Sequence, residues 1–99
     1  MGKKLRYVVH TRDGRLTLTL AGEMDGASAA ELCCRIERLG VGVCGLDFSR
    51  VEAIDLFGAR VLAHGLKALR EHGVRLDLEG LPAGTAQTFC LGGVLEAIV

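Results

Sequence analysis

The sequence has no tryptophan, one tyrosine, three phenylalanines and one proline among its 99 residues. So few aromatic side chains offer no series of stacking platforms for a single-stranded nucleic acid. The 12 acidic and 12 basic residues give a formal net charge of zero, so the basic surface that binds phosphate backbones is lacking as well. Nucleic acid is therefore not an expected partner.

Long hydrophobic runs are also missing. No stretch approaches the roughly 20 apolar residues that a membrane-spanning helix needs. The basic start Met1–Arg6 is not followed by the apolar run and small-residue cleavage site of a signal peptide, and Arg6 stands where a myristoylation signal has Ser or Thr. We therefore expect a cytoplasmic protein that is not inserted into a membrane.

The four cysteines form no Cys-x-x-Cys pair and lie at no metal-finger spacing from the three histidines. We interpret them as small apolar core residues, with a redox or metal role as the alternative; they are Cys33, Cys34, Cys44 and Cys90. No Ser-His-Asp, Cys-His or paired-carboxylate arrangement stands out. The sequence thus predicts no catalytic residue, no cofactor and no metal site.

What is present is typical of a folded domain: 49% hydrophobic and 24% charged residues. The length suits one core, so we predict a single domain over residues 1–99. Strand patterns at Tyr7–His10 and Arg15–Ala21 flank Asp13-Gly14, a tight-turn signal that predicts an antiparallel hairpin. In the second strand, leucines alternate with polar residues, which predicts one buried face; Gly22–Gly26 then breaks the pattern.

Two helices are predicted after the hairpin. Ser28 and Glu31 have the spacing of a capping box at the start of the first helix, and Gly40 predicts its end. Asp55 is predicted to cap the second helix, which Gly73 ends. The apolar positions predicted to face the core are Ala29, Leu32, Cys33, Ile36 and Leu39 in the first helix and Leu62, Leu66 and Leu69 in the second.

The apolar run Val41–Phe48 predicts a central strand covered on both faces, and Val74–Leu78 predicts another strand. Pro82 is predicted to open a loop into a final helix over Ala83–Leu91. This order predicts an α/β fold, in which a single mixed β-sheet has an N-terminal antiparallel hairpin, later parallel strands and covering helices.

Together these segments resemble the STAS domain, a family named from sulfate transporters and anti-sigma factor antagonists. Leu18-Thr-Leu-Ala-Gly-Glu-Met-Asp25 is similar to its Gly-Glu-Leu-Asp signature, and Leu46-Asp-Phe-Ser49 to its Asp-Leu-Ser element. Ile54-Asp55-x-x-Gly58 matches the loop before its second helix. Two further matches are Leu69-x-x-x-Gly73-x-x-Leu76 and Phe89-x-Leu-x-Gly93. Each motif alone is common, but their order and spacing over nearly the whole chain are distinctive.

The resemblance implies a bacterial protein-binding module without catalytic activity. In the anti-sigma factor antagonists, the second residue after the aspartate that matches Asp55 is a Ser or Thr. A partner kinase phosphorylates it, and the added charge of about −1.5 to −2 breaks the complex. Here that residue is Phe57, preceded by Leu56, so this switch cannot operate at the usual position. Arg60 stands close by, where many relatives have glycine.

Alternatives remain for several residues. Phe57 either fills the core beneath the helix start or forms an exposed anchor. Asp55 either caps the helix or contacts a partner; Asp25 either braces the turn before Ser28 or lines a shallow groove. The predicted partner-binding residues are Asp25, Asp55, Leu56, Phe57, Gly58 and Arg60. Ser49 and Thr85 are the candidate substitutes for the missing phosphorylation site.

The first functional hypothesis is a partner-switching module of transcription regulation, which binds an anti-sigma kinase or a related regulator without phosphorylation at Phe57. The alternative is an accessory subunit of an ABC-type lipid transporter that binds its cytosolic ATPase. The apolar pair Leu56 and Phe57 suits such a long-lived interface, because obligate interfaces are more hydrophobic than transient ones. A third hypothesis, a thiol-dependent or nucleotide-using enzyme, has only the cysteines in its favour, since no Walker-type glycine loop is present.

Overall fold

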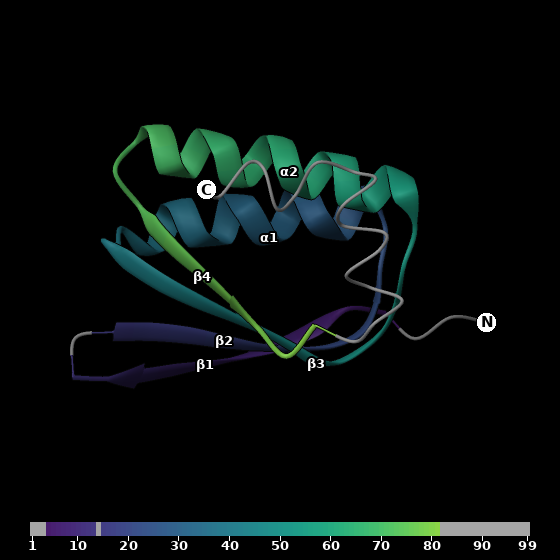
Figure 1. Cartoon of the computed structure of the whole chain (residues 1–99), viewed down its shortest axis with the longest axis horizontal. Helices are drawn as coiled ribbons and strands as arrows, with labels where there is room; N and C mark the ends of the chain where they lie inside the picture. The colour runs from purple at the N-terminus through teal and green to yellow at the C-terminus, as the bar shows by residue number, and fades with distance from the viewer. Residues whose placement is uncertain (1–3, 14, 82–99) are drawn as a thin grey trace.

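The computed structural model describes residues 4–13 and 15–81. Its elements are β1 (Arg6–Arg12), β2 (Arg15–Met24), α1 (Gly26–Leu39), β3 (Val43–Ile54), α2 (Leu56–Glu71) and β4 (Arg75–Glu79). The sheet has the strand order β1-β2-β3-β4, and both helices lie side by side on one of its faces (Figure 1). The predicted final helix, Thr85, Cys90 and the Phe89 motif lie outside the described residues.

The strand directions confirm the predicted mixed sheet. β1 and β2 are antiparallel, and Asp13 takes a positive φ of 52° in the turn that joins them. β3 is parallel to β2 on one side and to β4 on the other, so α1 and α2 are the connections between parallel strands. In the part of the chain that the structure describes, no helix is long and apolar enough to cross a membrane.

The core lies between the sheet and the two helices. The three leucines of β2 point toward the helices while the residues between them are less buried, as the alternation predicts. The predicted inner residues of both helices are buried, with the exception of Leu39 in the last turn of α1. The largest fully buried side chains come from all the layers: Phe48, Leu18, Leu20, Leu32, Ile36, Leu46, Leu62 and Leu66.

Two strands are longer than the sequence pattern predicts. β2 continues to Met24 because its last residues still pair with β3, as Gly22 does with Val51. The pairing shifts register between Thr19 and Ala21 and again between Gly22 and Glu23. Gly22, between the two shifts, takes a φ of 102° that other residues avoid. The predicted end at Ala21 is therefore wrong, and β3 likewise runs to Ile54 beyond the predicted end of the apolar run.

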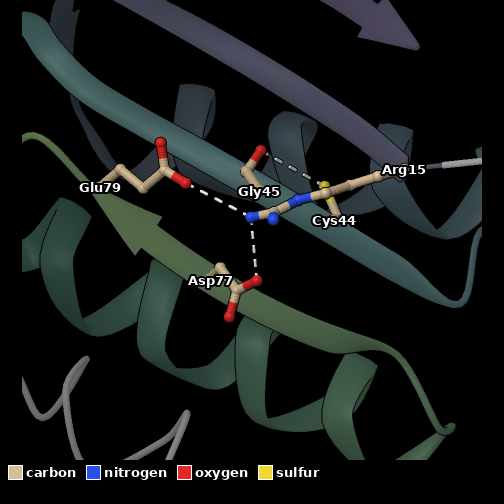
Figure 2. Close-up of polar contacts among 5 residues, drawn as sticks. All are labelled: Arg15, Cys44, Gly45, Asp77 and Glu79. Atoms are coloured by element: carbon tan, nitrogen blue, oxygen red, sulfur yellow. Dashed lines mark hydrogen bonds and ion pairs between the residues drawn. The ribbon is translucent and has the colours of Figure 1, made fainter. Parts of the chain in front are cut away.

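The face of the sheet away from the helices carries polar side chains. Arg15 crosses β3 over Gly45, which has no side chain in its way, and reaches β4 (Figure 2). Its Nη2 donates to Oδ2 of Asp77 at 3.0 Å and to Oε1 of Glu79 at 3.3 Å. In the described chain, the second face of β3 is thus covered at Gly45 by an arginine side chain rather than by the predicted helix.

Candidate functional site

Two helix starts meet at one end of the sheet. Met24 at the end of β2 pairs with Ile54 at the end of β3, and each strand is followed at once by an aspartate and a helix. The backbone N–H of Asp55 donates to the Met24 carbonyl oxygen at 3.4 Å. The parallel pairing of β2 and β3 therefore brings Asp25 and Asp55, which are 30 positions apart in the sequence, to the same edge.

Both aspartates are helix caps. The Asp55 carboxylate accepts the backbone N–H of Gly58, which confirms the predicted cap. Asp25 caps α1: its Oδ1 accepts the Ser28 N–H at 2.8 Å, and its own N–H donates to Ser28 Oγ at 2.9 Å. The predicted capping box of Ser28 and Glu31 is wrong by one turn, because Ser28 is the third helical residue and Asp25 the cap.

Gly58 allows the two helix starts to approach closely. A Cβ at this position would lie 3.0 Å from the Asp25 carbonyl carbon and 3.1 Å from the Met24 oxygen. Gly58 is itself buried in the first turn of α2, so of the predicted partner-binding residues it offers no exposed side of its own.

Phe57 is exposed. Its side chain is 69% accessible, and that of Leu56 is 41% accessible, so the structure favours the exposed alternative over a core role. The ring nevertheless has a fixed neighbour, because a Cβ on Gly26 would collide with its Cδ1 and Cε1 carbons. The absence of a side chain at Gly26 therefore lets the ring lie against the start of α1 while most of its surface faces solvent.

Arg60 belongs to the same surface. It is exposed one turn along α2 from Leu56 and Phe57, and residues three and four apart share a helix face. We call the three residues Leu56, Phe57 and Arg60 the α2 tip. The α2 tip thus presents two exposed apolar side chains and one exposed guanidinium on the same part of the helix.

A pocket of about 610 Å³ lies beside the α2 tip. Asp25 lines it, as the groove alternative predicted, so this residue both caps α1 and faces the pocket. The charged residues around it are four carboxylates and one lysine: Lys4, Glu23, Asp25, Glu31 and Asp55. This negative lining does not suit a nucleotide phosphate. Among the described residues, no group of three or more His, Cys, Asp or Glu side chains is arranged to hold a metal ion.

The cysteine interpretation holds for two residues. Cys33 and Cys44 are buried, and burial raises the pKa of Cys33 to about 12 and that of Cys44 to about 11. Since the thiolate is the reactive form, neither is suited to be a nucleophile at neutral pH. Cys34, in contrast, is exposed on α1 and is not a core residue.

Ser49, the other candidate phosphorylation site, is exposed within β3. Its backbone N–H donates to Asp47 Oδ1 at 2.9 Å. Sequence reasoning did not identify Gly26 as the residue against which Phe57 lies. The spacing Asp25-x-x-Ser28 was a visible signal for the true cap, because a capping residue bonds the backbone three positions on.

The hydrogen bonds that Asp25 and Asp47 accept predict a loss of stability in acid. The Ser28 N–H and hydroxyl lower the pKa of Asp25, and the Ser49 N–H lowers that of Asp47, each from an ordinary value of 3.8. A carboxyl group whose pKa is lowered by folding stabilises the protein above its unfolded pKa, and this contribution disappears as the pH falls through the folded pKa. We expect the free energy of unfolding to fall below about pH 4.

Urea unfolding of the wild type and of Asp25→Asn between about pH 2.5 and pH 7 tests this. Asparagine caps a helix about as well as aspartate but does not titrate, so the variant should lose less stability on acidification. An equal loss in both proteins would mean that the Asp25 carboxylate contributes nothing to the acid response.

The family model described as "Mlab, STAS domain" matches residues 8–99 of the chain. A search of the curated proteins finds no match. The chain is similar to an anti-sigma factor antagonist from Mycobacterium paratuberculosis at 17% identity and a TM-score of 0.77, covering 96% of this chain and 83% of the other.

Two further solved structures are similar. Phosphorylated SpoIIAA, a Bacillus cell fate determinant, aligns with a TM-score of 0.67 and 15% identity over 95% of this chain and 89% of its own. Mglu aligns at 28% identity with a TM-score of 0.62, over 73% of this chain. The chain spans only 19% of the length of Mglu. At identities of 15% and 17%, the two antagonist-like structures show the fold that they share with this chain.

Proposed function

The chain belongs to the STAS domain family, and on that premise we propose that it is a non-catalytic protein-binding module whose contact surface is the α2 tip. The observation that carries the proposal is the exposed pair Leu56 and Phe57 at the start of a capped helix. A solvent-facing phenylalanine stabilises the folded chain little, whereas the same ring buried in a partner's pocket can dominate a binding energy.

The tip is held ready for contact. The hydrogen bond from the Gly58 N–H to the Asp55 cap fixes the first turn of α2, and the absence of a side chain at Gly26 leaves room for the Phe57 ring against the start of α1. A backbone that is already fixed in a capped helical turn loses less conformational entropy when a complex forms. The favoured partner surface is therefore an apolar pocket that receives Phe57, with a group near its rim that accepts hydrogen bonds from Arg60.

The partner of the first proposal is an anti-sigma kinase or a related regulator. Phe57 has no hydroxyl, so the complex is not broken by phosphorylation at this position. Control then lies in the abundance of the chain or in the nucleotide state of the partner. The contact itself works by occlusion, because the start of α2 covers a surface of the partner.

A second candidate function is an accessory subunit of a transporter, bound to its cytosolic ATPase. The same observation favours it for a different reason: an apolar pair that cannot be phosphorylated suits a permanent interface, and such interfaces are more hydrophobic than transient ones. In both functions the α2 tip makes the contact, and the partner differs.

An enzymatic function has little support. Burial raises the pKa of the Cys33 and Cys44 thiols, and the pocket beside the tip is lined with carboxylates that repel phosphate groups. We therefore propose that the chain carries out no reaction of its own.

Affinity capture from a lysate of the native source, with the wild type and with Phe57→Asp as bait, distinguishes the two functions. A kinase-like ATPase or sigma regulator held by the wild type alone supports the regulatory function. A transporter ATPase or permease held by the wild type alone supports the accessory subunit. Equal capture of the same proteins by both baits would mean that the α2 tip does not make the contact.

A further inference from the structure

The outer edge of β1 is a second exposed surface of the described chain. β1 is the outermost strand, and in residues 4–13 and 15–81 no segment pairs with the side facing away from β2. Its pairing with β2 runs without a register shift from Arg6 opposite Ala21 to Arg12 opposite Arg15. A regular edge of this kind presents a row of backbone donors and acceptors to another strand.

Most features that protect natural sheet edges are missing from β1. It is seven residues long, contains no proline and has no bulge. Two neighbouring apolar side chains are solvent-accessible, Val8 at 58% and Val9 at 44%. The protective feature that β1 does have is charge of one sign: Lys4–Arg12 contains three basic residues and neither aspartate nor glutamate.

Cations stand on both sides of this edge. Arg6 and Val8 pair with Ala21 and Thr19 of β2, and both face away from the helices. Tyr7 and Val9 lie opposite the buried leucines of β2 and so face the helix side. There Arg35 of α1 donates from Nε to the Tyr7 hydroxyl at 2.9 Å, which places its guanidinium beside β1.

We propose that the edge of β1 binds an extended acidic segment of a partner protein, which adds to the sheet as a further strand. Backbone hydrogen bonds would pair the bound segment with β1. Its alternate side chains would contact Arg6 on one face of the sheet and Arg35 on the other. Its apolar side chains would cover Val8 and Val9. A second copy of the chain is a poor occupant, because β1 against β1 sets basic residues opposite basic residues.

The β1 edge is a different surface from the α2 tip, so this inference goes beyond the proposed function. The two surfaces belong to different elements, with β1 at the outer edge of the sheet and α2 in the helical layer (Figure 1). A partner that used both would be held at two points, and the loss of either contact alone would leave the other measurable.

The test uses the full chain labelled with nitrogen-15 and a blocked peptide of about eight residues in which glutamate and valine alternate. A second peptide carries lysine in place of glutamate. We expect the acidic peptide to shift the NMR signals and slow the hydrogen exchange of β1 amides from Tyr7 to Thr11, and the basic peptide to do neither. Arg6→Glu should weaken binding of the acidic peptide at least about threefold, since it removes an attraction and adds a repulsion.

Lys67→Glu, the same charge reversal at an exposed residue of α2, serves as the control and should bind like the wild type. Phe57→Asp should also bind the acidic peptide normally, which separates this proposal from the fate of the α2 tip. The proposal is overturned if the two peptides bind alike, if the shifted amides lie outside β1, or if Arg6→Glu and Lys67→Glu weaken binding equally. Protection of the β1 amides that rises with the concentration of the chain alone would indicate self-pairing and overturns it too.

Discussion

Phe57→Asp should leave the free energy of unfolding nearly unchanged and weaken partner binding by about 2 kcal/mol or more. The folded chain loses little because the ring is 69% exposed, and an acidic residue in the first turn of α2 is favoured by the helix dipole. The complex loses an aromatic anchor and would have to bury a carboxylate in its place. Urea unfolding measures the first effect, and titration calorimetry with the captured partner measures the second.

Leu39→Asp is a suitable control for this variant. Leu39 is another exposed apolar residue on a helix, but it lies in the last turn of α1, at the opposite end from the α2 tip. Partner binding by this variant should match the wild type. A Phe57→Asp protein that unfolds far more easily while binding normally would place Phe57 among the residues that stabilise the fold and would contradict its role as an exposed anchor.

Gly65→Ala should destabilise the chain by about 1 to 3 kcal/mol, the usual range for overpacking. At an open helix position the same change would stabilise by about 1 kcal/mol, because alanine is the better helix former. Gly65 is different because α1 and α2 touch there: an added Cβ would lie 2.7 Å from the Cys33 Cβ and would also collide with the Cys33 sulfur. The two helices would have to separate, and the core beneath them would loosen.

A double-mutant cycle identifies the contact that is responsible. In a Cys33→Gly background the obstacle is gone, so Gly65→Ala should there become neutral or stabilising. In a Cys34→Gly background it should remain as damaging as in the wild type, because Cys34 is exposed. Urea unfolding of the variants measures these differences. An equal effect of Gly65→Ala in all three backgrounds would contradict a close approach between Gly65 and Cys33.

The sequence predicted what depends on local pattern. The alternation in β2, the inner rows of the helices apart from Leu39, and the Asp55 cap follow from spacing and residue type, and all of them are confirmed. The position of the α1 cap could not be decided from the local sequence. Asp25 and Ser28 are both good caps, and only the continued pairing of β2 with β3 places the helix start after Asp25.

The exposure of Phe57 was undecided for a similar reason. A phenylalanine near a helix start is compatible with the core and with the surface, and hydrophobicity alone does not distinguish them. The ring lies on the surface because the parallel pairing of β2 and β3 brings the two helix starts together. Gly26, which has no side chain, leaves room for the ring on the outside. Phe57 and Gly26 are 31 positions apart in the chain, so their contact is invisible to a short sequence window.

Hydroxyl-radical footprinting of the chain, free and in its complex, tests most directly whether the α2 tip is the contact surface. Phe57 and Leu56 should be labelled readily in the free chain and become protected in the complex, while Val8 stays equally labelled unless the same partner also covers β1. Phe48 is fully buried and should remain unlabelled in both states, which serves as an internal reference. A stable complex in which Phe57 is labelled as fast as in the free chain would contradict the assignment of the α2 tip as the contact surface.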